Sequence, residues 1–141
     1  MTIPIAQTRS RRSVWRSVVA VLAGFLTVVV LSVVTDQVLH VLKIYPPWDK
    51  PMFDPGLNLL ALAYRSIYTL LGGFIAAKLA PTAPRGHATV LGIIGTVIGT
   101  AAAVFTITKY DLGPDWYPIA LAVTAFPLTW LGGVLATRRR T

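Results

Sequence analysis

The sequence predicts an all-α integral membrane bundle of four transmembrane helices, and three observations lead to this fold class. First, 55% of the residues are hydrophobic and only 13% are charged, whereas a soluble domain carries about 25% charged residues. Second, four apolar runs are each long enough to cross the roughly 30 Å hydrocarbon core of a bilayer. Third, the basic residues flank these runs, which is the pattern of topology signals in membrane proteins.

Residues 1–13 form a polar, basic tail that we expect to be a disordered or interfacial segment in the cytoplasm. The stretch SRRSVWR (10–16) is close to a twin-arginine export signal. However, the apolar run that follows is too long for a cleaved signal, and no A-x-A-like cleavage site closes it. We therefore interpret the arginines as a positive-inside anchor for a first span over residues 14–42.

The second span is predicted over residues 57–79, and Arg65 sets it apart from the other three spans. A charged side chain at this depth is costly and requires a partner or a water-filled cavity. The loop before this span, KIYPPWDKPMFDPG (43–56), contains four prolines that exclude a regular helix. Its aromatic residues favour a stiff cap at the membrane–water interface. The alternative interpretation is a lid that gates a substrate.

The third and fourth spans are predicted over residues 87–108 and 116–136, so that one transmembrane domain covers residues 14–137. A basic tail, residues 138–141, ends the chain. Small residues recur in the spans at positions where they would let helix backbones approach closely. The predicted packing positions are Gly92, Gly95 and Gly99 in the third span, Gly72 and Gly73 in the second, and Gly132 and Gly133 in the fourth.

The distribution of charge predicts that both termini are cytoplasmic. Nine basic residues fall on one side of the predicted spans and three on the other, and the side with the excess is cytoplasmic. A weak internal repeat relates LGGFIAAK (71–78) to LGGVLATR (131–138), and VLAGFLTVV (21–29) to VLGIIGTVI (90–98). It indicates either a duplicated helical hairpin or a chance similarity among small and aliphatic residues.

Asp36 near the end of the first span and Arg65 in the second are predicted to form an ion pair. At 1.5 Å per residue, their depths below the outer boundary differ by only about 3 Å. The predicted intramembrane polar site around this pair contains Asp36, Gln37, His40, Asn58, Tyr64, Arg65 and Tyr68. We interpret it as a structural clamp between the first two spans. The alternative is a site for a proton, an ion or an anionic head group.

Other chemistry has little support in the sequence. The chain has no Cys and no Glu, and it lacks the HExxH, GxSxG and P-loop motifs. Asp36 and His40, with Asp49 or Asp54, would be a weak metal site, because two such ligands four residues apart are common by chance. We therefore predict no catalytic residue, cofactor or metal, and an enzyme is the least favoured class. Because the basic residues flank apolar runs, we do not expect nucleic acid as a partner.

The segments TDQVLH (35–40), YPPW (45–48), AYRSIYTLLGGFIAAKLAP (63–81) and HATVLG (87–92) follow one another in an order that resembles a group of small four-span bacterial membrane proteins. The resemblance implies a bacterial inner membrane location and four helices, and it brings no activity, cofactor or site residue. The leading prediction is a structural or accessory inner membrane protein, with the lipid bilayer and either further copies of itself or a larger membrane complex as partners. The alternative is a small transporter or channel subunit for a proton, an ion or a small anionic solute.

Overall fold

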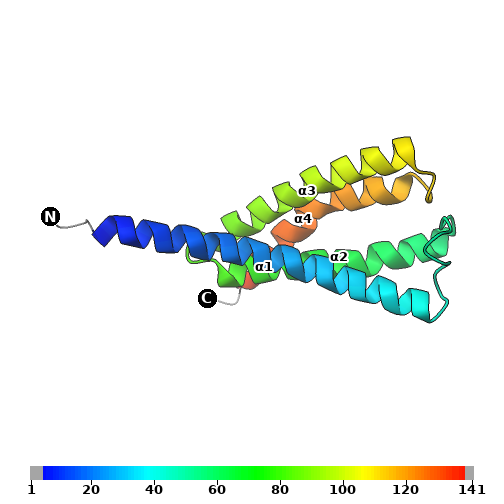
Figure 1. Cartoon of the computed structure of the whole chain (residues 1–141). Helices are drawn as coiled ribbons and strands as arrows, with labels where there is room; N and C mark the ends of the chain where they lie inside the picture. The colour runs from blue at the N-terminus through cyan, green and yellow to red at the C-terminus, as the bar shows by residue number, and fades with distance from the viewer. Residues whose placement is uncertain (1–4, 139–141) are drawn as a thin grey trace.

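The computed structural model describes residues 5–138, which form four α-helices and no strand. Figure 1 shows one hairpin of α1 (Ile5–Val41) and α2 (Pro55–Leu79), and a second of α3 (Pro84–Lys109) and α4 (Trp116–Arg138). Within this described range, all four helices are long and apolar enough to span a membrane. The predicted all-α class and the number of helices are therefore confirmed.

The two ends of the bundle are different (Figure 1). The start of α1, the end of α4 and the short α2–α3 turn lie at one end, which we call the terminal end. The loops 42–54 and 110–115 lie at the other, which we call the loop end. All five aspartates of the chain belong to the loop end, either in these loops or near the end of α1.

The helix α1 begins much earlier than the sequence predicts. The predicted first span begins at residue 14, whereas the helix starts at Ile5 and is 37 residues long. No Pro or Gly occurs between Ile5 and Gly24, so no residue in this stretch breaks the helix. At 1.5 Å per residue α1 is about 55 Å long, well beyond one hydrocarbon thickness. Its first turns consequently project past the other helices (Figure 1). The outer parts of the two predicted tails, residues 1–4 and 139–141, lie outside the described range.

The second and third helices begin slightly before their predicted limits because each starts with a proline. Pro55 occupies the first turn of α2, and the Asp54 carboxylate accepts a hydrogen bond from Leu57 N–H at 3.1 Å. This is a regular N-cap, and proline is tolerated there because its missing N–H needs no partner. Pro84 similarly starts α3, after Ala83 in the left-handed region at φ 44°.

The helix α2 is central to the bundle and contacts α1, α3 and α4. Its contact with α1 is a close backbone approach at two glycines. A Cβ on Gly24 would lie 2.5 Å from the carbonyl oxygen of Gly72, and one on Gly72 would lie 2.8 Å from that of Gly24. Its contact with α4 is equally close, because a Cβ on Gly73 would collide with the backbone of Thr129 and one on Gly132 with that of Leu70. No side chain larger than hydrogen fits at these positions.

The helices α3 and α4 pack through the small-residue stripe of α3. A Cβ on Gly133 would lie 2.5 Å from Ala88 Cβ, and one on Gly99 would lie 3.3 Å from Ala122 Cα. Gly95 faces the same helix more loosely, because a Cβ added there would lie 3.6 Å from Ala125 Cβ. The buried core of the bundle is accordingly made of small residues, such as Ala77, Ala88 and Ala136. Backbone proximity and not the burial of large side chains therefore holds these helices together.

A glycine at a close backbone approach is expected to tolerate substitution far less than a glycine where an added Cβ would make only an ordinary van der Waals contact. Gly132→Ala should lower the free energy of unfolding in detergent by about 2 kcal/mol or more, because overpacking at a backbone contact costs about 1–3 kcal/mol. Gly95→Ala is the matched control in α3 and should be neutral or stabilising by up to about 1 kcal/mol, since alanine favours a helix. Equal effects of the two substitutions would contradict the close packing of α2 against α4.

Candidate functional site

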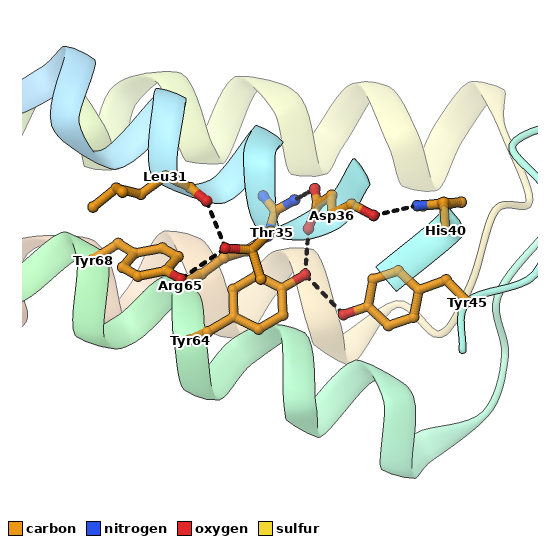
Figure 2. A network of polar contacts seen from close by, with 8 residues as sticks. All are labelled: Leu31, Thr35, Asp36, His40, Tyr45, Tyr64, Arg65 and Tyr68. Atoms are coloured by element: carbon orange, nitrogen blue, oxygen red, sulfur yellow. Dashed lines mark hydrogen bonds and ion pairs between the residues drawn. The ribbon is translucent and has the colours of Figure 1, made fainter. Parts of the chain in front are cut away.

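The polar centre of the molecule is an ion pair between α1 and α2 (Figure 2). Arg65 Nη2 donates a hydrogen bond to Asp36 Oδ2, and the Tyr64 hydroxyl donates to Asp36 Oδ1. The Asp36 side chain is 13% exposed and the Arg65 side chain 32%. Both oxygens of the carboxylate thus accept from donors on α2, an arrangement that suits the ionised form.

The geometry of α2 explains how two consecutive residues reach one carboxylate. Successive side chains on an α-helix point about 100° apart, so Tyr64 and Arg65 flank the line along which α2 faces α1. Asp36 projects from α1 into the space between them (Figure 2). A carboxylate held from both sides cannot slide along α2 without breaking a bond to one of the two donors.

A chain of hydroxyl groups extends the site to the 42–54 loop. The Tyr45 and Tyr64 oxygens are 2.8 Å apart, and because Tyr64 donates its proton to Asp36, Tyr45 is the donor between them. Tyr45 is only 5% exposed. Burial raises the pKa of the Tyr45 hydroxyl above its usual value, so this group keeps its proton and stays a donor. The order of donation therefore runs from the loop through Tyr64 to the ion pair.

Tyr68 makes a third hydrogen bond between α1 and α2. Its hydroxyl lies 2.7 Å from Thr35 Oγ1, and Thr35 in turn donates to the carbonyl oxygen of Leu31 at 2.7 Å. Tyr68 is therefore the donor to Thr35. Thr35 is not among the predicted site residues, although it directly precedes Asp36.

His40 and Gln37 do not touch the Asp36 carboxylate. His40 Nδ1 bonds the main-chain oxygen of Asp36 at 2.7 Å, and its ring stacks on Trp48 with centroids 3.7 Å apart and planes at 5°. The His40 ring is also nearly perpendicular to the Tyr45 ring, and the two ring centroids are 5.3 Å apart. His40 thus fastens the loop to the end of α1. Gln37 is exposed, because it lies on a different face of α1.

Asn58 is separate from the ion pair and holds the loop from the other side. It is 2% exposed, and its Nδ2 donates to the carbonyl oxygens of Met52 at 3.0 Å and Asp54 at 2.8 Å. The predicted set of seven residues is therefore divided by the structure. Asp36, Tyr64, Arg65 and Tyr68 come together, while His40 and Asn58 anchor the loop and Gln37 faces outward.

The site contains one further tyrosine, Tyr45, which sequence reasoning missed. The sequence indicates Tyr45 only as an interfacial aromatic residue. It has no sequence signal beyond its aromatic character, because the folding of the 42–54 loop brings its hydroxyl to Tyr64.

The guanidinium group of Arg65 is only partly satisfied. Its Nε is buried and has no hydrogen-bond partner among the residues that the structure describes. An unsatisfied buried donor costs about 1–3 kcal/mol, so an oxygen acceptor at this position would be favourable. Metal binding has no comparable support, since no group of three or more His, Asp or Glu side chains comes together in the described part of the chain.

The two tyrosine hydroxyls of α2 are expected to contribute unequally. Tyr64→Phe should lower the free energy of unfolding by about 2 kcal/mol, because a hydrogen bond to a charged group contributes about 1.5–3 kcal/mol. Tyr68→Phe is the matched control on the same helix and removes a bond between neutral groups, worth about 1 kcal/mol. Denaturant titration of both variants in one detergent measures the difference. A cost for Tyr68→Phe equal to or above that for Tyr64→Phe would contradict the central place of the Asp36 carboxylate.

Comparisons with protein-family models, with curated proteins and with solved structures found no match for this chain. No relative therefore supplies a role for the polar site, and its own contacts are the basis on which a function is proposed.

Proposed function

We propose that the chain is a multi-pass membrane protein with a structural or accessory role, in which the Asp36–Arg65 pair clamps α1 to α2. The observation that carries this proposal is the use of both carboxylate oxygens by donors from α2. A carboxylate that accepts a hydrogen bond at each oxygen from the same neighbouring helix locks the two helices together.

The surface of the bundle supports placement in a bilayer. Large aliphatic side chains such as Leu26, Val33 and Val97 are more than half exposed, while the buried hydrophobic positions are nearly all alanines. In water this arrangement would be unfavourable, and in lipid the exposed chains meet acyl tails. The excess of basic residues at the terminal end supports cytoplasmic termini. We propose the bacterial inner membrane as the location on the sequence resemblance alone.

The clamp also gives a reason for an accessory role. The helix α1 contacts α2 and α3, and it makes no contact with α4 among the described residues. It is therefore the least embedded helix, and the ion pair is its strongest polar attachment. We propose that the clamp holds α1 in place so that its outer face is presented to lipid, to a second copy of the chain or to a larger membrane complex.

A double-mutant cycle on Asp36→Ala and Arg65→Ala tests the clamp. Each single substitution should lower the free energy of unfolding in detergent by about 2–4 kcal/mol, near the range for one removed partner of a buried pair. The double substitution should cost less than the sum by at least about 1 kcal/mol, because the two side chains interact directly. Asp111→Ala with Arg12→Ala is the matched control, since these exposed residues lie at opposite ends of the bundle. Strict additivity of Asp36→Ala and Arg65→Ala would refute the clamp.

A small transporter or channel subunit for a proton, an ion or a small anionic solute is the second candidate. The specific observations in its favour are the Tyr45–Tyr64–Asp36 hydroxyl chain and the unpartnered Arg65 Nε. Such a chain could pass a proton between the loop and the ion pair. Arg65 Nε could donate a hydrogen bond to an oxygen atom of an anion.

Flux measurements in proteoliposomes test this candidate. It predicts uptake of acetate or of protons that Arg65→Lys abolishes, because lysine cannot reproduce the forked geometry of the guanidinium. Arg85→Lys at the terminal end is the control and should retain the flux. Unchanged flux in a folded Arg65→Lys variant, or no flux in the native protein, would exclude Arg65 from a transport pathway.

A further inference from the structure

A cavity of about 300 Å³ lies at the loop end of the bundle, between α2, α3 and α4. Apolar side chains such as Ala102, Ile107 and Leu121 form much of its wall. The two loops that close it are bonded together, because Met52 N–H donates to the carbonyl oxygen of Leu112 at 2.7 Å. Gly113 packs so tightly on this contact that a Cβ would lie 2.6 Å from Met52 O. The hydrogen bond and the close packing between the two loops therefore hold this wall of the cavity in place.

One polar atom of a buried residue faces this cavity without a protein partner. Asn58 lines the cavity and is 2% exposed, and both bonds of its Nδ2 are made to loop carbonyl groups. These bonds fix the orientation of the amide, which directs Oδ1 toward Gly113, another lining residue. Oδ1 accepts no hydrogen bond from any residue within 5–138, and it is not sealed from the cavity as the buried Arg65 Nε is. A ligand that displaces water from Oδ1 has to replace the hydrogen bond that water makes there, so the site favours a ligand with a hydrogen-bond donor.

The lining residues restrict the charge and the size of a ligand. They include no Lys, Arg or His, and Asp115, their one carboxylate, is exposed. Burial of a charged group against these apolar walls would therefore be costly, and a neutral donor is favoured. Cavities of about 150 Å³ hold benzene, so a volume near twice that size suits a body of about twelve non-hydrogen atoms.

We propose that this cavity binds a neutral lipophilic alcohol or phenol, whose hydroxyl donates to Asn58 Oδ1 and whose apolar body packs on Ala102, Ile107 and Leu121. The rings of Tyr110 and Tyr117 complete the lining. Such a molecule partitions into a bilayer and reaches the cavity from the membrane. The site uses none of the bonds of the Asp36–Arg65 pair, so its test is independent of the clamp.

Photolabelling of the native protein in lipid nanodiscs tests the site without any substitution. The probe is an alkanol with a diazirine on its chain, and the labelled peptides are identified by mass spectrometry. Labelling of residues 99–121 should saturate and should be competed by 1-decanol. Decyl methyl ether should compete roughly fivefold less well, the loss expected for one neutral hydrogen bond. Labelling that does not saturate, or equal competition by the alcohol and the ether, would overturn the proposal.

A matched pair of variants locates the binding. Ala102→Phe places a ring in the cavity and should weaken saturable labelling at least tenfold. Ala101→Phe is the control, because Ala101 is the neighbouring residue on α3 and lines a different hollow on the outer face. It should retain the labelling. Equal labelling of the two folded variants, as judged by gel filtration, would place the alkanol outside the cavity and overturn the assignment.

Discussion

We propose that the α1–α2 hairpin depends on the ion pair between Asp36 and Arg65. Either charge alone would be costly in an apolar surrounding, because the solvation that water provides is lost. The two charges are paired, and the Tyr64 hydroxyl donates to the second carboxylate oxygen. Together these bonds form a contact with a defined geometry. A hydrophobic contact between the same helices would allow many registers, whereas this one allows few.

The rest of the bundle is arranged so that this contact can form. The close approaches at Gly24, Gly72, Gly73 and Gly132 bring three helix backbones together without large side chains between them. Beyond the ion pair, Tyr45 and His40 connect the 42–54 loop to the same cluster, and Asn58 fixes the other end of that loop. Packing at the middle of the helices and polar bonds at the loop end thus support each other.

The sequence alone predicts the helices well, because four apolar runs bounded by charges and prolines have few alternatives. It also brings Asp36 and Arg65 to one depth, since the rise of a helix converts residue number into distance. It does not reveal Tyr45, because the folding of the 42–54 loop places this hydroxyl beside Tyr64 and no spacing rule describes that. For Asn58, the sequence predicts membership of the ion-pair site, and the structure places its side chain elsewhere. Helical spacing puts it above Arg65, but its amide turns to the loop carbonyl groups and to a different cavity. The helical start of α1 is missed for another reason, since a charged segment without Pro or Gly has no local stop signal.

The most direct measurement of the central claim is the distance between the loop ends of α1 and α2. The chain has no cysteine, so spin labels can be attached at Val41→Cys and Leu60→Cys, two exposed positions on these helices. In nanodiscs, the clamp predicts one narrow distance distribution for the otherwise native chain. It predicts a broad distribution after Arg65→Ala, with the narrow one retained after the control substitution Arg85→Ala. A distribution that stays narrow without Arg65 would contradict the claim that the ion pair holds α1 against α2.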